Sequence, residues 1–359
     1  MTPAIVHVAS GREWRGGQRQ VWLLARELAR RGVEQVVVTG KDSELARRLV
    51  SAGVRVRLAR WWAGLDPRVL PVILSELRHR RAILHAHDAH ALTLAGVCAG
   101  LSGAPLVTTR RVTFPLRRKL FWARAQRVIA ISGAVRDALT LDGLTPERLT
   151  VIPSAVDVAE LRATTGPDVR TRFGLPERGQ VAVSLGALTP EKDQSTLVEA
   201  AALLVRDLPD LHWVIVGEGP LRSVLQRRIA QLGLEDRVHL AGQLADPHVA
   251  LAGADVFVLS SLAEGLGSSV LAAMAMDVPV VATRVGGVPE LLGSGGGALV
   301  QAGSPSEFAA AVRRVFSEPG YAANLMQAAR RELGRFTPGA MADQVVEVYR
   351  SCAHSIEGS

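Results

Sequence analysis

Cysteine is scarce in this 359-residue sequence, which contains only Cys98 and Cys352 and no C-x-x-C pair. Two isolated cysteines exclude a disulfide framework and a cysteine-rich structural zinc centre, and they are typical of a protein from a reducing cytosol. The sequence also lacks an Asp-x-Asp pair, a G-x-G-x-x-G turn and a Walker lysine. A standard dinucleotide site and a P-loop are therefore not predicted, and neither a metal nor a cofactor is expected.

Lysine is almost as rare, because 39 of the 42 basic residues are arginine and only Lys41, Lys119 and Lys192 remain. The net charge of +8 is also unevenly spread. Residues 1–180 carry 29 basic and 15 acidic side chains, or +14, whereas residues 181–359 carry 13 and 19, or −6. Two units of opposite charge are predicted, and the basic one favours an anionic partner: a phosphorylated substrate, a nucleic acid or an anionic membrane surface.

No segment is predicted to span a membrane. The longest uncharged stretch, residues 89–109, contains three glycines and a proline, which favours a helix, a break and a buried strand over one spanning helix. The first ten residues lack the basic start and apolar core of a signal peptide. A cytoplasmic location is therefore expected.

Short β-branched runs alternate with segments of helical periodicity, in two successive sets. The predicted strands of the first set are residues 5–8, 36–39, 54–58, 83–86, 106–109, 128–131 and 149–152, and those of the second are residues 181–185, 213–217, 238–241, 256–259, 280–282 and 298–300. Nearly continuous apolar strands that alternate with helices indicate parallel sheets covered on both faces. We predict an α/β fold of two doubly wound, Rossmann-like units that face each other across a ligand-binding cleft.

A polar seam between the two sets of strands sets the domain boundaries. We place the N-terminal unit at residues 1–168 and the second unit at residues 169–336. A C-terminal segment at residues 337–359 contains a predicted helix that is long enough to cross back to the first unit.

Two groups of residues follow strands of the first set and are candidates for ligand contacts. Gly16 and Gly17 begin a helix after the first strand, where backbone amides can approach an anion; a flexible turn is the alternative. Arg110 and Arg111 end the fifth strand and would place two fixed cations at the rim of the cleft; a solvated face is the alternative.

Three histidines, His85, His87 and His90, lie at the end of the fourth strand of the first set. They occupy a strand-to-helix turn rather than one face of a helix. A His87 that contacts sugar or is hydrogen-bonded is therefore favoured over a metal centre.

In the second set, Gly186 follows the first strand and Lys192 stands where the next helix begins. Lys192 is the only lysine among residues 120–359, and a cation in an acidic unit suits a diphosphate. The alternative is an ordinary surface position at a helix N-terminus, where a cation is slightly unfavourable.

The most informative stretch follows the fourth strand of this set. Glu264 precedes a Gly265-Leu266-Gly267 turn, and Ser268 and Ser269 begin a helix. Free amides at such a helix start can bind phosphate, and the carboxylate beside them can accept hydrogen bonds from sugar hydroxyls. The alternative is a glutamate that merely caps the helix.

These residues belong to a longer motif, EGLGSSVLAAMAMDVPVVATRVGGVPE at residues 264–290. It closely resembles the E-G-x-G-x-x-x-L-E-A-M-A-x-G-x-P-V-V-A-T…G-G-x-P-E signature of the GT-B glycosyltransferases of family four, the retaining group. Gly16-Gly17 resembles the N-terminal glycine loop of that family, and residues 216–220 and 254–260 match as well. The resemblance extends over nearly the whole chain.

The resemblance implies a site residue by residue. The second unit would hold a nucleotide-sugar donor, with Lys192 on the diphosphate, the amides of Leu266–Ser269 on phosphate and Glu264 on the donor-sugar hydroxyls. Gly186, Gly217, Gly265 and Leu244 would line this site, with Leu244 near the base. The first unit would supply the acceptor site and close over the donor, and Gly16, Gly17 and Arg110 are the predicted substrate-binding residues there. Glu264, Lys192, His87 and Arg111 are the predicted catalytic residues.

The resemblance also implies the reaction: metal-independent transfer of a sugar, with retention, by front-face substitution in which the donor diphosphate accepts the acceptor proton. A UDP-sugar is favoured over GDP- or ADP-sugars as the donor. A bacterial glycolipid or a surface polysaccharide of the lipopolysaccharide kind is the expected acceptor. Nucleic acid is not an expected partner, and no oligomeric state is predicted.

The sequence departs from the family pattern at three positions. Ala272 replaces a second glutamate that often contacts ribose, Ala187 replaces a common arginine, and Arg111 stands where a cleft histidine is frequent. Two alternative functions therefore stay open at this point, a non-catalytic nucleotide-sugar binding subunit and a sugar-nucleotide epimerase.

Basic and aromatic residues occur together at two places in the first unit, residues 117–122 (RRKLFW) and residues 60–62 (RWW). This combination is typical of surfaces that rest on an anionic leaflet, and it predicts peripheral attachment to the inner face of the plasma membrane. The alternative is an amphipathic core helix and a buried tryptophan pair.

Overall fold

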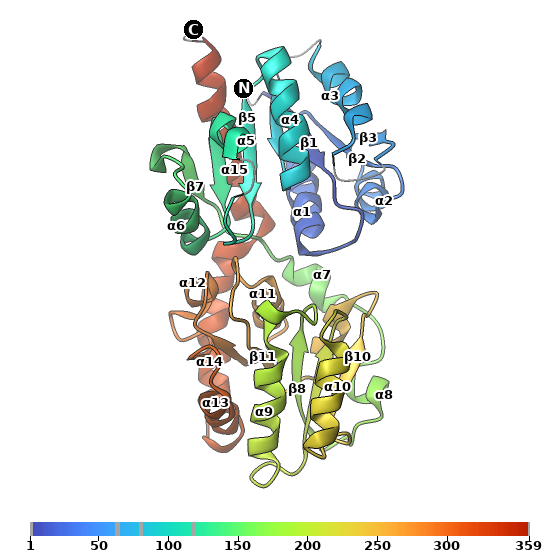
Figure 1. Cartoon of the computed structure of the whole chain (residues 1–359), viewed down its shortest axis with the longest axis vertical. Coiled ribbons are helices and arrows are strands. Elements are labelled where there is room, and N and C mark those ends of the chain that lie inside the picture. Colours follow the sequence, from blue (N-terminus) through green and yellow to red (C-terminus); the bar gives the residue numbers. More distant parts are fainter. Residues whose placement is uncertain (1–2, 62–64, 79–81, 117–118, 358–359) are drawn as a thin grey trace. The chain divides into compact units, whose positions relative to one another are not determined.

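The computed structural model describes residues 3–61, 65–78, 82–116 and 119–357, with side chains as far as residue 353. The chain divides into two compact units (Figure 1), one formed by Met1–Ala155 with Thr337–Ser359 and the other by Val156–Phe336. Each unit is described by itself below.

The first unit alternates strands and helices along its whole length. Its strands are β1 (Ala4–Ala9), β2 (Gln35–Gly40), β3 (Val56–Ala59), β4 (Ala82–Ala86), β5 (Leu106–Arg110), β6 (Arg127–Ala130) and β7 (Leu149–Val151). Its helices are α1 (Gly16–Arg30), α2 (Glu44–Ser51), α3 (Leu70–Leu77), α4 (Ala89–Ser102), α5 (Lys119–Arg124), α6 (Gly133–Leu141) and α15 (Pro338–Glu357), with short 3-10 turns η1 (Pro67–Val69) and η2 (Pro146–Arg148).

All strands of the first unit are parallel and pair in the order β3-β2-β1-β4-β5-β6-β7. The direction in which strands are added reverses between β1 and β4. In an open α/β sheet, ligands bind beyond the carboxyl ends of the strands at such a reversal. The segments that follow β1 and β4 are therefore placed to form a site.

The second unit repeats this organisation. Its strands are β8 (Gln180–Leu185), β9 (Leu211–Val216), β10 (Val238–Gly242), β11 (Val256–Leu259), β12 (Val280–Thr283) and β13 (Ala298–Val300). Its helices are α7 (Val158–Arg162), α8 (Val169–Phe173), α9 (Gln194–Leu204), α10 (Arg222–Gln231), α11 (Ser268–Ala275), α12 (Val288–Leu292), α13 (Pro305–Ser317) and α14 (Tyr321–Glu332), with 3-10 turns η3 (Pro190–Lys192), η4 (Pro247–Leu251) and η5 (Leu333–Phe336).

The sheet of the second unit is also parallel throughout, in the order β10-β9-β8-β11-β12-β13. The direction in which strands are added to this sheet reverses between β8 and β11, so the segments after these two strands meet at one edge of the sheet. The predicted architecture of two parallel, Rossmann-like sheets is thereby confirmed.

Apolar side chains of the helices cover the sheets, and each unit contains a large buried apolar cluster. In the first unit, Leu28 of α1 and Tyr349 of α15 are fully buried against Ile5 and Ile83 of the central strands. In the second unit, a corresponding cluster joins α9 and α13 to Trp213 of β9. Each large apolar side chain that is fully buried contributes about 1.5–3 kcal/mol to folding.

The C-terminal helix α15 packs on α1 of the first unit, as the sequence predicts. Arg31, at the end of α1, donates to a carboxylate oxygen of Asp343 at 2.5 Å and to the Gly339 carbonyl at 3.0 Å. One face of α15 is buried through Met341, Val345 and Tyr349. The helix is thus an integral part of the first unit although it is last in the chain.

The observed units divide at residues 155 and 156 rather than at residue 168. The intervening residues form α7, which packs on α11 of the second unit, where Arg162 donates to the Ala275 carbonyl at 3.0 Å and forms an ion pair with Asp277.

The predicted membrane-facing aromatic residues are placed differently from the expectation. Trp61 and Trp122 are buried, with 7% and 3% of their surface exposed, because both pack into the first unit. Arg117, Arg118 and Trp62 lie outside the described residues. Within the described part of the chain, no helix is long and apolar enough to cross a membrane.

Candidate active site

In the second unit, most of the predicted donor-site residues follow the two strands that flank the sheet reversal. Gly186 and Lys192 come after β8, and residues 260–269 come after β11. Backbone hydrogen bonds join the two segments, since the Leu262 amide donates to the Glu191 carbonyl at 2.8 Å. The topology therefore brings Lys192 and Glu264 together across more than seventy residues of sequence.

Lys192 and Glu264 form a direct ion pair, with 2.5 Å between Nζ and Oε1. The same carboxylate oxygen accepts a hydrogen bond from Ser261 Oγ at 2.8 Å. Ser260 Oγ in turn donates to the Lys192 carbonyl at 3.0 Å and fixes the lysine backbone. Ser260 and Ser261 are buried, whereas the lysine and glutamate side chains keep 25% and 10% of their surface exposed. A ligand can therefore reach both charged groups.

The turns after β8 and β9 approach each other so closely that only glycine fits. A Cβ atom at Gly217, whose φ is +145°, would lie 1.9 Å from the Gly186 carbonyl oxygen. The turns are joined by hydrogen bonds from Gly186 N to Val216 O and from Leu188 N to Glu218 O, each 3.0 Å long. Gly186 and Gly217 thus lie side by side and expose backbone beside Lys192.

A similar close approach holds the Glu264 loop. Gly286 has a φ of +52°, and a Cβ atom there would lie 1.8 Å from the Glu264 carbonyl oxygen. Gly267, with a φ of +94°, is the N-cap of α11 and has no side chain to cap the helix. The helix start at Ser268 and Ser269 is therefore suited to an anionic ligand.

The remaining donor-site positions differ in what they offer. Gly265 and Leu266 are buried, and Leu244 is half-buried in the loop after β10. Ala272 is buried within α11, and Ala187 is exposed beside Gly186. Neither alanine offers the carboxylate or the guanidinium that the family pattern has there.

In the first unit, the segments after β1 and β4 meet at the sheet reversal. Gly16 and Gly17 are the first residues of α1, whose N-cap Arg15 forms no side-chain cap and whose first turn has no acidic residue. Asp88 is the N-cap of α4, where its carboxylate accepts from the Ala91 amide at 2.9 Å and from the Ser10 amide at 2.7 Å. The two loops are thereby tied together.

Behind these loops lies a histidine cluster that the sequence reveals only in part. His7, His85 and His87 are buried, and their candidate ligand nitrogens lie within 4.8 Å of one another. His7 Nδ1 and His87 Nε2 share a hydrogen bond of 2.9 Å. His85 uses both ring nitrogens, toward Tyr349 Oη at 2.6 Å and Thr109 Oγ1 at 2.8 Å. These contacts join the three histidines, Thr109 and Tyr349 in one network of hydrogen bonds and ring contacts.

Burial keeps the three histidines neutral. It lowers the pKa of His7 to about 4, and it holds the pKa values of His85 and His87 well below the usual value near 6.5. The positive charge of Arg111 lowers both of the latter further. His90 is exposed on α4.

The two neighbouring arginines after β5 have different surroundings. Arg110 is used within its own loop, where it donates to the carbonyl oxygens of Val112 and Phe114 and lies 5.3 Å from the ring centre of Trp122. Arg111 instead passes over the start of α1, since a Cβ atom at Gly17 would lie 3.7 Å from its Cδ. Burial lowers the pKa of Arg111 to about 10.

Arg111 and His87 line a small pocket that is partly open to solvent. Its polar lining is completed by Gln20, His85, Thr109 and Ser154, and its apolar wall by Leu24, Ile129, Ile131, Ile152, Pro153, Met341 and Val345. The predicted residues Gly17, His87 and Arg111 are therefore brought together in the first unit.

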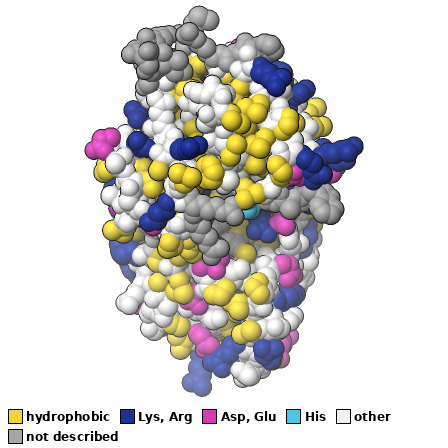
Figure 2. Space-filling view, turned by 45° about the horizontal axis from the view of Figure 1, so that its top comes forward, with side chains coloured by type: hydrophobic (Ala, Val, Ile, Leu, Met, Phe, Trp, Pro, Cys, Tyr) yellow, Lys and Arg dark blue, Asp and Glu magenta, His cyan; other side chains and the backbone are white. Residues whose placement is uncertain are grey.

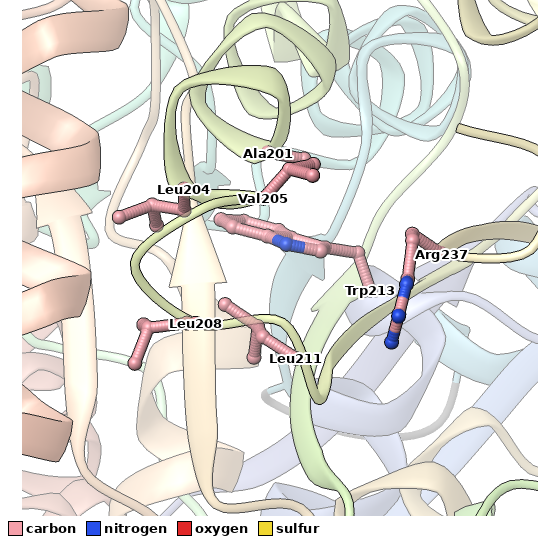
Figure 3. A pocket seen from close by; sticks show the side chains of 7 residues that line it. All are labelled: Ala201, Leu204, Val205, Leu208, Leu211, Trp213 and Arg237. Atoms are coloured by element: carbon pink, nitrogen blue, oxygen red, sulfur yellow. The ribbon is translucent and has the colours of Figure 1, made fainter. Parts of the chain in front are cut away.

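A second pocket lies in the second unit, under Trp213 (Figure 3). Its lining is mostly aliphatic and comes from the end of α9 and the start of β9, with Arg237 beside the indole. It therefore lies at the amino end of the sheet, opposite the segments that carry Lys192 and Glu264. We interpret it as a gap in core packing.

Sequence reasoning missed His7, Ser261 and Tyr349. His7 becomes visible only through strand register, because β1 pairs with β4 so that His7 lies beside His85. Ser261 stands in the predicted loop but carries no distinguishing pattern of its own. Tyr349 is far away in sequence and reaches the cluster only because α15 packs on the first unit.

Comparison with known proteins identifies the family. Residues 167–332 match the protein family described as "Glycosyl transferases group 1", and residues 14–160 match the family described as "Glycosyltransferase Family 4". The chain therefore belongs to the GT-B glycosyltransferases of family four, which are retaining enzymes that use nucleotide-sugar donors. This membership favours the transferase over the binding subunit and the epimerase.

Relatives and solved structures of this kind cover most of the chain. The alpha-D-kanosaminyltransferase of Streptomyces kanamyceticus is 30% identical over 70% of this chain and 67% of that protein. The D-inositol 3-phosphate glycosyltransferase of Kineococcus radiotolerans is 29% identical over 91% of this chain and 88% of that protein. The crystal structure of Anabaena HepE in complex with UDP and glucose has the same fold, with a TM-score of 0.84, 22% identity and coverage of 97% of this chain and 100% of that chain.

Proposed function

We propose that the chain transfers a sugar from a UDP-sugar to an acceptor that is bound in its first unit. The observation that carries this proposal is the Lys192–Glu264 pair at the sheet reversal of the second unit, beside the start of α11. Support for UDP comes from the HepE structures, which are described as complexes with UDP and with UDP-glucose.

In the proposed donor site, each group meets one part of the nucleotide sugar. Lys192 Nζ pairs with the diphosphate, and the backbone of residues 265–269 at the start of α11 donates to phosphate oxygens. The Glu264 carboxylate accepts hydrogen bonds from hydroxyls of the donor sugar. Gly186 and Gly217 allow the diphosphate to approach the backbone, and Leu244 lies against the base.

The proposed reaction is a front-face substitution at the anomeric carbon. The bond from this carbon to the diphosphate oxygen breaks, and a bond to the acceptor oxygen forms on the same face. The acceptor proton passes to the departing diphosphate. Lys192 and the amides of α11 stabilise the negative charge that develops on the leaving group, which is where fixed electrostatic contacts lower the barrier.

We further propose that the first unit holds the acceptor through Gly16, Gly17, His87, Arg110 and Arg111, and that the acceptor is a glycolipid or a surface polysaccharide. Similarity to the lipopolysaccharide outer core galactosyltransferase WaaB, with a TM-score of 0.70 and 15% identity, is compatible with this class. A cytoplasmic enzyme attached to the inner face of the plasma membrane would meet such an acceptor.

Titration of the purified chain with UDP tests the donor site. Lys192→Ala is expected to cost about 1.5–3 kcal/mol of binding free energy, a roughly 10- to 150-fold loss of UDP affinity, because a charge-assisted contact is lost. Lys41→Ala removes another of the three lysines and is the matched control. Equal UDP affinity in the parent and in Lys192→Ala would remove this lysine from the site.

Glu264→Gln tests the sugar contact separately. The amide keeps the shape of the carboxylate but accepts weaker hydrogen bonds, so we expect slower hydrolysis or transfer of UDP-glucose with UDP affinity close to that of the parent. A turnover rate equal to the parent's would leave Glu264 with a structural role only.

A further inference from the structure

The pocket of the first unit contains a cation for which the structure provides no counter-charge. Arg111 Nε is buried without a hydrogen-bond partner. Within the described residues, its guanidinium forms neither an ion pair nor a hydrogen bond. Arg111 is half-buried, so a ligand in the pocket can still reach its guanidinium, and a partly desolvated guanidinium normally pairs with a carboxylate or a phosphate.

The acidic group that acts electrostatically on Arg111 is already engaged elsewhere. Asp88 raises the pKa of Arg111 through its charge, but it forms no ion pair with it. Its two carboxylate oxygens accept from the Ser10 amide and hydroxyl and from the Ala91 amide. Asp88 therefore caps α4 and cannot neutralise Arg111 at contact distance.

Two further features of the same place favour an anion. His87 is buried, lines the pocket with Arg111, and leaves its Nδ1 without a partner. The start of α1, over which the Arg111 side chain passes, has no side-chain cap and no acidic residue in its first turn. Its positive helix end therefore adds to the charge of Arg111.

We infer that this pocket binds an anionic group of the acceptor, a phosphate or a carboxylate, through a charge-assisted contact with Arg111 and a hydrogen bond with His87 Nδ1. The inference rests on the proposed function and narrows its acceptor to molecules that carry such a group. The pocket is small, so it takes the charged group itself, and its apolar wall at Ile131 and Ile152 contacts the adjoining part of the acceptor.

The donor diphosphate is a second source of the same chemistry. The acceptor is favoured because the second unit already supplies Lys192 and the start of α11 for the diphosphate, while the Arg111 pocket is built wholly from the first unit and α15. The two sources are separable by experiment, because each depends on a different cation.

The experiment uses the full-length chain and inorganic phosphate as the probe, with melting temperature measured at constant ionic strength against chloride. Phosphate is expected to raise the melting temperature of Lys192→Ala, since a ligand that binds only the folded state stabilises it. It should not do so in the double variant Lys192→Ala/Arg111→Gln. The matched control is the double variant Lys192→Ala/Arg47→Gln, which removes an exposed cation of α2 instead of Arg111 and should keep the phosphate effect.

UDP affinity identifies the source of the anion. Arg111→Gln is expected to bind UDP within about twofold of the parent, because the inference assigns Arg111 to the acceptor. A UDP affinity at least tenfold weaker would overturn it by assigning the anion to the donor. An equal phosphate effect in Lys192→Ala and in the double variant would also overturn it. If the parent does not bind UDP, the proposed donor site is wrong. The phosphate experiment still tests the Arg111 pocket, because it does not depend on UDP binding.

Discussion

Lys192 and Glu264 show how a site is held ready at the level of single residues. Each neutralises the other, with 2.5 Å between Lys192 Nζ and Glu264 Oε1, and Ser261 fixes the orientation of the carboxylate. A donor would exchange this internal pair for contacts with diphosphate and sugar hydroxyls. Because the ion pair must break when the donor binds, each new contact adds less to the binding free energy than it would with a free charge. Until then, the pair keeps both charges from binding other ions.

The histidine cluster predicts a dependence of stability on pH. The folded-state pKa of His7, about 4, lies below its unfolded value near 6.5, so the unfolded chain binds more protons between these values. The stabilisation is complete above pH 6.5 and is lost as the pH falls toward 4. We expect His7 to lower the free energy of unfolding by up to about 1.4 kcal/mol per pH unit in this range, and His85 and His87, whose pKa values are also lowered, to act in the same direction.

Urea unfolding at several pH values measures this effect. His7→Gln is expected to show a shallower decline below pH 6.5, because one titrating group is removed and an amide can still hydrogen-bond to His87. His90→Gln, which changes an exposed histidine of α4, is the control and should keep the parent's decline. A His7→Gln profile parallel to the parent's would contradict the buried, neutral His7.

At the scale of elements, the turns after β8 and β9 are predicted to be intolerant of side chains. Gly217→Ala would place a Cβ atom 1.9 Å from the Gly186 carbonyl oxygen at a φ of +145°. Backbone must move to relieve this contact, and we expect a loss of at least about 3 kcal/mol in unfolding free energy together with weaker UDP binding.

Gly32→Ala is the matched control for that variant. Gly32 also has a positive φ, +68°, but a Cβ atom there meets no heavy atom within 4 Å. Only the backbone strain remains, about 1–2 kcal/mol, and UDP binding should be unchanged. If the two variants were equally stable, the close approach of the two turns would not be what requires glycine.

Much of this element-level organisation follows from sequence, because a buried parallel strand is a short apolar run and its carboxyl end is where a ligand binds. The strand ends that Lys192 and Glu264 follow could therefore be predicted, whereas the roles of these two residues in a donor site stay predictions. Three features could not be predicted, because each depends on how distant segments of the chain pair. They are the ion pair between Lys192 and Glu264, the position of His7 beside His85, and the hydrogen bond between Tyr349 and His85. A basic-aromatic run does not reveal which side chains turn inward. The sequence left open whether Trp61 and Trp122 face a membrane or the core, and the structure buries both.

At the scale of the whole molecule, charge separates the two halves of the sequence. Residues 1–180 sum to +14 and residues 181–359 to −6. The acidic half carries the proposed donor site, so its positive groups, Lys192 and the start of α11, act locally within a negative unit. The basic half attracts anions over a longer range, which suits both the proposed Arg111 pocket and a negatively charged membrane.

The last prediction concerns that membrane. Figure 2 shows apolar side chains beside lysine and arginine on the face that it presents. Phe114 and Leu120 are exposed, whereas Trp61 and Trp122 are buried and cannot anchor the chain. Attachment should therefore depend mainly on charge, with about 1 kcal/mol from each cation near an anionic surface.

Co-sedimentation with vesicles measures this attachment. We expect binding to vesicles that contain phosphatidylglycerol at low salt, and little binding to vesicles of phosphatidylcholine alone. Raising the salt concentration to about 1 M shortens the screening length to roughly 3 Å. Cations of the protein farther than this from the lipid headgroups are then no longer attracted to them, so the chain should be released. Binding that persists at high salt would show that apolar contacts dominate after all. No binding to anionic vesicles at low salt would mean that the chain meets its acceptor away from the membrane surface.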